Sequence, residues 1–218
     1  GAAGREREVL VHVGAAQAAG RVPLDLDGLG VDLVSVSGHK LGGPPGTGAL
    51  FVRRGLRVAP LLLGGDQERA RRAGMEDLPG LVGLGAAAAA ATAGLGSEEV
   101  RCRSLTARLV DGLTTVPGVE LLGDPDPSGR LPHLVCLAID GVEPQGVLLG
   151  LDQRGIAAHS GSACASEGLE PSPVLEAMGV DAHRSLRLSV GWITTTDDVE
   201  AAIAAVPDAV ARLRSLAG

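Results

Sequence analysis

Aromatic residues are almost absent from this chain of 218 residues, which has one tryptophan, one phenylalanine and no tyrosine. Any hydrophobic core must therefore be built from leucine, valine, isoleucine and alanine, within a hydrophobic share of 45%. That share is large enough to form a core in one large domain or two small ones. The composition therefore predicts a globular protein.

Positive charge is also scarce, since the formal net charge is −7 at pH 7 and the arginines are scattered along the chain. Without a basic stripe we expect no binding to nucleic acid. The chain also has no run of eighteen apolar residues and no charged leader followed by an apolar stretch. We therefore expect neither a membrane association nor export.

Cysteine is rare, with only Cys102, Cys136 and Cys164. Three scattered cysteines cannot form a disulfide framework, and no CxxC or HxxxH spacing indicates a metal site, so we expect reduced thiols in the cytoplasm and no metal. Cys102 and Cys136 fall in an expected helix and an expected apolar strand, where buried, inert thiols are usual. Cys164 lies in a run of small residues, Ser160-Gly-Ser-Ala-Cys-Ala-Ser166, as an exposed nucleophilic thiol requires.

Lysine is just as scarce as tryptophan and phenylalanine, because Lys40 is the only lysine among 19 lysines and arginines. It follows an apolar, β-branched run, Val31–Val36, and precedes a cluster of glycine and proline. Buried strands that end this way deliver polar groups to the carboxyl edge of a sheet. A desolvated lysine there could attack a carbonyl carbon, whereas the alternative is a surface lysine in a lysine-poor composition.

Alternation of apolar runs with helical stretches predicts an α/β fold, with a domain boundary between residues 95 and 96. Six consecutive alanines predict a long helix that packs closely through small side chains and ends near Gly94 to Ser97, where Ser97 caps the next helix. The expected strands are Val9–Val13, Val31–Ser37, Ala49–Arg53, Val119–Leu122, His133–Ile139, Gly155–Ala158 and Ser185–Val190. The remaining helices are expected at Pro144–Arg154, Pro171–Met178 and Asp197–Leu216.

Arg187 alternates with apolar residues on one of these strands, so we expect its side chain to face inward. An inward arginine needs an anion, which is either a substrate carboxylate or an internal salt-bridge partner. The glycines from Gly42 to Gly48 precede a strand rather than a helix, so they indicate a turn and not a phosphate-binding loop.

Two motifs resemble those of a known family, the cysteine desulfurases of the NifS/IscS type, which are pyridoxal-phosphate (PLP) enzymes of aminotransferase class V. Ser-Gly-His-Lys at Ser37–Lys40 is similar to the family's lysine motif, and Ser-Gly-Ser-Ala-Cys at Ser160–Cys164 to its cysteine motif. The motifs at His12–Gln17, Gly64–Arg69 and Leu186–Gly191 follow in the family's order. The resemblance covers essentially the whole chain.

The resemblance implies the PLP-dependent transferase fold, which is aspartate aminotransferase-like (fold type I). Residues 1–95 would form the latter part of the PLP-binding large domain, and residues 96–218 the small C-terminal domain that carries the cysteine loop. The family's first half is missing, so the chain is similar to a C-terminal portion. A sheet truncated in this way should have an unpaired edge and exposed apolar surface.

The resemblance also implies a reaction. Lys40 would bind the cofactor covalently and then move the substrate α-proton, Arg187 would bind the carboxylate of L-cysteine, and Cys164 would take the sulfur as a persulfide. L-alanine would be released, and the persulfide would pass to an acceptor protein in iron-sulfur cluster assembly or in thiolation pathways. The enzyme would be a homodimer.

Three further residues would hold the cofactor according to the resemblance. Ser37 and His39 would bind its phosphate, and Gln17 would lie near the phenolic oxygen of its ring.

Two positions depart from the family's pattern. Gly14 stands where the family has an aspartate that keeps the pyridine nitrogen protonated, and Met75 stands where a threonine reaches the phosphate of the partner subunit. These departures and the missing half leave open whether this chain is an enzyme by itself. The alternatives are an inactive fragment or degenerate homologue that binds a partner or carries sulfur on Cys164, and a related lyase or aminotransferase of the same fold.

Overall fold

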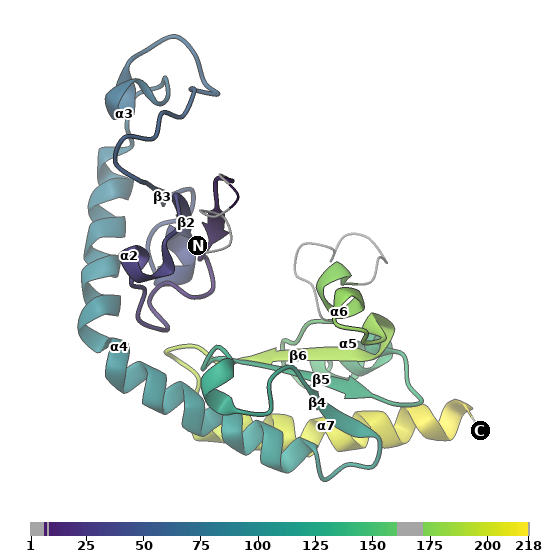
Figure 1. Cartoon of the computed structure of the whole chain (residues 1–218). Helices are drawn as coiled ribbons and strands as arrows, with labels where there is room; N and C mark the ends of the chain where they lie inside the picture. The colour runs from purple at the N-terminus through teal and green to yellow at the C-terminus, as the bar shows by residue number, and fades with distance from the viewer. Residues whose placement is uncertain (1–6, 8, 161–171, 218) are drawn as a thin grey trace. The chain divides into compact units, whose positions relative to one another are not determined.

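The structure, a computed structural model, describes residues 7, 9–160 and 172–217 (Figure 1). It divides the chain into two compact units, Gly1–Gly96 and Ser97–Gly218, one residue beyond the boundary proposed from the sequence. Each unit contains a three-stranded sheet. One long helix, α4 (Leu78–Leu113), contributes its first part to the first unit and its second part to the second unit.

In the first unit, the central strand of the sheet pairs in parallel with the strand before it and antiparallel with the strand after it. The central strand is more exposed than the sequence suggested, because within it only Val34 is buried. The elements of this unit before α4 are β1 (His12–Gly14), α2 (Leu26–Leu29), β2 (Leu33–Ser37), the 3-10 turn η1 (Gly38–Leu41), β3 (Gly48–Val52) and α3 (Gln67–Ala70).

The two faces of this sheet differ in chemistry, because side chains alternate along each strand. Val13, Val34 and Val36 belong to a small apolar cluster whose buried members include Ala15 and Val31. The opposite face carries three hydrogen-bonding side chains, His12, Ser35 and Ser37, together with the apolar side chains that share it by register, Leu33, Leu50 and Val52. The sheet therefore has one apolar face and one mixed, more polar face on which the hydrogen-bonding groups lie.

Asp32 joins the three strands at the end of the sheet where β2 begins. Its Oδ2 accepts from the Val11 N–H at 2.8 Å, and its Oδ1 accepts from Arg53 Nε at 2.6 Å. The carboxylate is only 13% exposed, so screening by water is reduced on that side of the pair. This contact fixes the strand register from which the polar face is built.

Much apolar surface of the first unit is exposed, as expected for part of a larger sheet. Four of the five residues of β3 are exposed, and both β1 and β3 are edge strands among the described residues. Three consecutive leucines follow, at 94%, 53% and 80% exposure. The exposed large apolar residues of this unit are Val9, Leu10, Leu29, Leu50, Phe51, Leu61, Leu62, Leu63, Met75, Leu78, Leu81 and Val82.

The expected break between two helices at Gly94 to Ser97 is wrong, because α4 runs through it without interruption. Neither Gly94 nor Gly96 adopts the left-handed conformation that a helix-ending glycine requires. Glycine permits a helix end but does not impose one, and propagation from strong helix formers on both sides is cooperative. Beyond the glycines, Glu98 pairs with Arg101 and Glu99 with Arg103 along the same helix.

The same helix has the length and composition of a membrane span. This was not expected from the sequence, which has no uninterrupted run of eighteen apolar residues. An 18-residue window of α4 has a mean hydropathy of 1.6 and is 6% buried. One such helix is weak evidence, because core helices of other proteins pass the same test. Alanine and leucine raise the hydropathy here, and two glycines of this helix, Gly80 and Gly83, contact Thr47 and Pro44 of the first unit.

The second unit has a much larger core. Its sheet is antiparallel in the order β4 (Val119–Leu122), β5 (Leu134–Ile139) and β6 (Ser185–Ser189). Val135, Leu137 and Ile139 of β5 face a core shared with α4, α5 (Pro144–Asp152) and α7 (Thr196–Ala217). Figure 1 shows α7 below this sheet and α6 (Pro173–Ala177) above it.

The strand expected at Gly155–Ala158 is wrong. Gly155 adopts a φ of 74°, and among the described residues only one isolated bridge, between His159 and Arg187, joins the following backbone to β6. A left-handed glycine interrupts the extended backbone that a strand needs. The other expected strands and helices are confirmed with shifted ends, except that Pro171 lies outside the described residues.

We expect Gly96→Ala to raise the free energy of unfolding by about 0.5–1 kcal/mol, because a helical glycine in open space gains from a side chain. Gly55→Ala is the matched control, since an added Cβ there also meets nothing within 4 Å but φ is +87°. It should lower stability by about 1–2 kcal/mol. Denaturant titration followed by circular dichroism tests both, and a loss of stability in Gly96→Ala would contradict a continuous α4.

Candidate functional site

The only lysine of the chain lies on a tight turn directly after β2. The turn η1 begins after Ser37 and ends at Gly42, whose φ of 86° lets its N–H reach the carbonyl oxygens of Gly38 and His39. Lys40 and His39 are both exposed on this turn. The structure thus places Lys40 at the carboxyl end of β2, as predicted, but with its side chain in solvent rather than buried.

Gly38 anchors the turn through a close backbone contact. Its N–H donates to the Thr47 carbonyl oxygen at 2.9 Å, and Thr47 Oγ1 donates to the Pro44 carbonyl oxygen at 2.6 Å. A Cβ added at Gly38 would overlap Thr47 Oγ1 and lie 2.9 Å from the Thr47 carbonyl oxygen. The glycine-rich segment therefore is a turn, as predicted, and it holds the lysine turn in place.

The first part of α4 supports the turn through glycines. A Cβ added at Gly83 would lie 2.6 Å from Pro44 Cγ, and one added at Gly80 would lie 2.9 Å from Thr47 Cγ2. Leu84 Cα lies 3.4 Å from the position of a Cβ on Gly43. The predicted close packing is present at Gly80 and Gly83, whereas the six alanines at 86–91 are half-buried or exposed.

Hydrogen-bonding side chains gather on the polar face of the sheet beside the turn. Ser37 Oγ lies 2.9 Å from His39 Nδ1, so the structure brings together the two residues predicted to bind phosphate. His12 Nε2 lies 3.1 Å from Ser35 Oγ in a pair that the sequence analysis did not find. Period-two alternation of Ser35 and Ser37 in the apolar strand was the signal that could have indicated it.

This donor set fits most of a PLP molecule. Hydroxyl and imidazole groups at Ser37 and His39 suit a phosphate, and a primary amine at Lys40 suits an aldehyde. At Gly14, by contrast, an added Cβ would meet only Ser35 Oγ, at 3.9 Å. The strand has room for an aspartate beside Ser35, but the chain supplies no carboxylate at this position.

Two other residues singled out from the sequence lie on loops of the first unit. Gln17 is half-buried in the turn after β1, where the N–H groups of Ala18 and Ala19 donate to the Ala15 carbonyl oxygen. Met75 is 91% exposed, and its thioether provides no hydroxyl for a phosphate. Between them, residues 68–70 adopt left-handed φ values of 53°, 62° and 60°, a conformation that is costly for residues other than glycine.

The second unit contributes Arg187, which lies in β6 between two neighbours. Cys136 of β5 is its partner on one side, and His159 is its partner on the other. Leu186 and Leu188 enter the core, so the half-buried Arg187 side chain projects to the opposite face of the sheet. The expectation that Arg187 faces inward is therefore wrong, because alternation places the leucines there.

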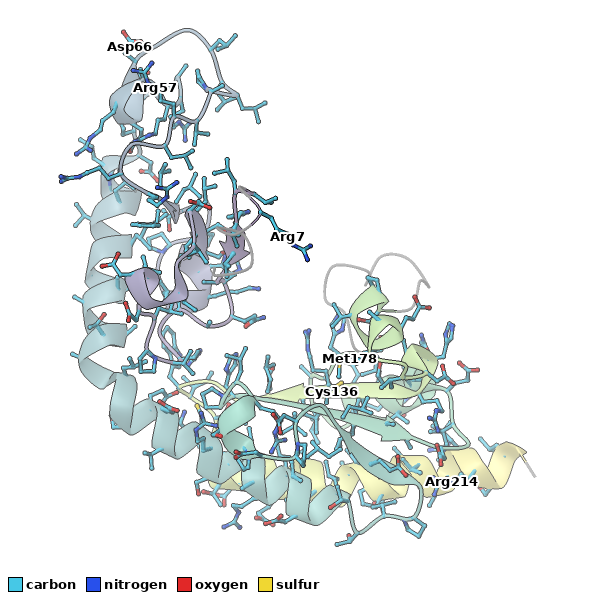
Figure 2. All side chains as sticks on the ribbon, viewed as in Figure 1. Arg7, Arg57, Asp66, Cys136, Met178 and Arg214 are labelled. Carbon is cyan, nitrogen blue, oxygen red and sulfur yellow. The ribbon has the colours of Figure 1, made fainter. Side chains whose placement is uncertain are left out.

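The cysteines differ in environment. Cys102 is fully buried, with its Sγ 3.4 Å from Glu98 Oε1. Cys136, labelled in Figure 2, is half-buried; burial raises the pKa of its thiol, and the positive charge of Arg187 opposes this only in part. Neither is a favourable nucleophile. Cys164, the predicted nucleophile, lies outside the described residues.

Comparison with known proteins gives a consistent result. A family model described as "Aminotransferase class-V" matches residues 1–202. Cysteine desulfurase IscS of Methanosarcina thermophila is 44% identical over 97% of this chain and 53% of its own length. Cysteine desulfurase NifS of Azotobacter vinelandii is 42% identical over 95% of this chain and 52% of its own length.

Solved structures agree with the sequence matches. The NifS-like protein from Rickettsia africae superposes with a TM-score of 0.85 at 30% identity, over 94% of this chain and 55% of that one. An apo cysteine desulfurase from Thermococcus onnurineus gives a TM-score of 0.81 at 25% identity, over 96% of this chain and 54% of that one. The chain therefore spans about half the length of the relatives it matches.

We expect Gly38→Ala to lower the free energy of unfolding by about 1–3 kcal/mol, because the added methyl overlaps Thr47. Gly85→Ala in α4 is the control, since an added Cβ there meets nothing within 4 Å, and it should not destabilise the chain. Thermal denaturation of both variants measures the difference. Equal stabilities would show that the lysine turn does not depend on this contact.

Proposed function

Because this chain belongs to the aminotransferase class-V family, whose members are PLP-dependent enzymes, we propose that it is part of a cysteine desulfurase. Its fold is that of the fold-type-I PLP enzymes, of which it spans about half the length. The observation that carries the proposal is the turn Ser37–Lys40, where a primary amine lies one residue beyond a bonded hydroxyl–imidazole pair. Such a turn offers binding groups for both the phosphate and the aldehyde of PLP.

Each residue on this turn has a separate role in the proposal. Ser37 and His39 would bind the phosphate, and Lys40 would hold the aldehyde carbon and later carry the proton removed from the substrate Cα. Gln17 would lie near the phenolic oxygen. When bound, the cofactor supplies an electron-withdrawing ring that acidifies the substrate Cα–H.

The sulfur step uses Cys164 and Arg187. Arg187 orients L-cysteine through its carboxylate, and the Cys164 thiolate attacks the substrate sulfur. The new S–S bond forms as the substrate Cβ–S bond breaks, the electron pair stays on carbon, and protonation there gives L-alanine. The persulfide on Cys164 then passes to an acceptor protein, and the functional assembly is a homodimer.

A second candidate follows from Gly14, where the strand has space but no carboxylate. A chain without this carboxylate would bind partners or carry sulfur on Cys164 without cofactor chemistry. The retained Lys40, Ser37 and His39 support the first candidate, since a sulfur carrier has no use for them. The two candidates therefore differ in whether PLP reaches Lys40.

We expect borohydride treatment of the full chain mixed with PLP to give a stoichiometric adduct on Lys40, located by peptide mass mapping. Lys40→Arg keeps the charge but cannot form the bond, so its only adduct should be a trace on the N-terminal amine. Only such a trace adduct on the unaltered chain would contradict cofactor binding by this chain alone, and would leave a fragment that needs its other half or the carrier candidate.

We expect Gly14→Asp to increase L-alanine formation from L-cysteine by about tenfold or more, because a carboxylate at this position stabilises the protonated pyridine nitrogen. Gly14→Asn is the matched control with the same shape and no charge. In the Gly14→Asp background, Cys164→Ser should abolish persulfide formation, whereas a simple lyase would keep releasing sulfide. Equal rates for the aspartate and asparagine variants would show that Gly14 is not the position that limits the chemistry.

A further inference from the structure

His159 and Arg187 are directly opposite each other on neighbouring backbone segments. The His159 N–H donates to the Arg187 carbonyl oxygen at 3.1 Å, and the Arg187 N–H donates to the His159 carbonyl oxygen at 2.6 Å. Residues that exchange both hydrogen bonds in an antiparallel pair project their side chains to the same face. His159 and Arg187 are therefore neighbours on one face of the sheet.

That face is the one turned away from the main core. Ala158 packs against the core together with Leu186 and Leu188. The alternating residues, His159 and Arg187, must therefore face the other way. Cys136 continues the same row in β5, as the register with Arg187 requires.

One atom of this row indicates a ligand. Nδ1 of His159 is shielded from solvent and has no hydrogen-bond partner among residues 7, 9–160 and 172–217. A shielded polar nitrogen without a partner is unfavourable by about 1–3 kcal/mol, so such atoms mark sites that another molecule completes. The neighbouring Arg187 guanidinium indicates the class of ligand, because two adjacent donors favour an anion with two oxygens.

We propose that His159 donates a hydrogen bond from Nδ1–H to the same carboxylate that Arg187 binds. The inference rests on the proposed function, because it assigns a second binding residue to the carboxylate of the amino-acid substrate. The guanidinium supplies parallel N–H groups, and the imidazole supplies a third donor from the neighbouring segment. The ligand class is a small α-amino carboxylate, of which L-alanine, the product of the proposed reaction, is an unreactive member.

The position of His159 links this second binding residue to both residues of the proposed sulfur step. It pairs through its backbone with the strand that carries Arg187, and it stands five residues before Cys164 in the sequence. His183 offers a comparison in the same unit, because it is exposed on the 3-10 turn η3 (Ala182–Arg184) and its backbone N–H donates to Asp181 Oδ1.

The test is a titration of the full chain, labelled with ¹⁵N and ¹³C, with L-alanine, followed through the histidine ring signals by NMR. We expect the His159 ring signals to shift and saturate, with a protonated Nδ1, while the His183 signals stay unchanged. His159→Ala should weaken L-alanine binding by about tenfold, the effect of one hydrogen bond to a charged group. His159→Gln, which keeps a side-chain N–H, should recover part of that loss, and His183→Ala should cause none.

The outcomes separate this inference from the proposed function. If Arg187→Gln abolishes binding but His159→Ala leaves it unchanged, His159 is not a carboxylate donor and the role of Arg187 stands. If Arg187→Gln also has no effect, both the inference and the proposed carboxylate site are overturned. If the His159 ring signals of the unaltered chain do not shift with L-alanine, the inference is overturned. This result needs no variant, so it holds even if His159→Ala fails to fold.

Discussion

The close approach of the backbone at Gly38 to Thr47 is the contact on which the candidate site depends. It folds the chain back directly after β2, so that Lys40 follows Ser37 on a turn rather than continuing the strand. α4 supports the same turn from outside, where Gly80 and Gly83 leave no space for a larger side chain. Glycine is needed on both sides of this contact because the segments approach too closely to leave room for a side chain. The tight turn that carries Lys40 is a consequence of this close approach.

The two units differ in how completely they bury their own apolar residues. In the second unit, leucine and valine from three strands and three helices form one continuous core. In the first unit, the buried apolar cluster has only Ala15, Val31 and Val34 as fully buried members, while large side chains of β3 and the following loop lie in solvent. Burial of apolar surface is the main favourable term in folding, so we expect the second unit to resist denaturant better than the first.

The sequence predicted most strands and helices, because short β-branched runs and capped helices are local signals. It also predicted that Lys40 directly follows a strand and that a glycine-rich turn comes next, and the resemblance implied that Ser37 and His39 act on one phosphate. It failed at Gly94 to Ser97 because glycine permits two outcomes, and the choice depends on cooperative propagation of α4 rather than on the residues themselves. It failed at Arg187 because alternation fixes which residues share a face but not which face meets the core.

The pairs His12 with Ser35 and His159 with Arg187 were missed for a related reason. Each joins residues from segments that are separate in the sequence, and their partners are set by strand register. A strand pattern gives the alternation of each segment, but the register depends on the turns and on contacts such as that of Asp32 with Val11 and Arg53. Cross-strand pairs of this kind require the fold before they can be recognised.

PLP enzymes usually combine two properties, binding of the cofactor and its activation. In this chain the turn Ser37–Lys40 concerns the first and Gly14 the second. Holding the cofactor needs donors for its phosphate and an amine for its aldehyde, and these groups are present on one turn of this chain. Activating the cofactor needs a negative charge at the ring nitrogen, because only a protonated ring withdraws electrons strongly from the substrate. An added Cβ at Gly14 meets nothing closer than Ser35 Oγ at 3.9 Å, so the position is not filled by another side chain that could replace the charge. Binding of PLP and turnover of L-cysteine are therefore independent questions for this protein, and retention of the first carries no implication for the rate of the second.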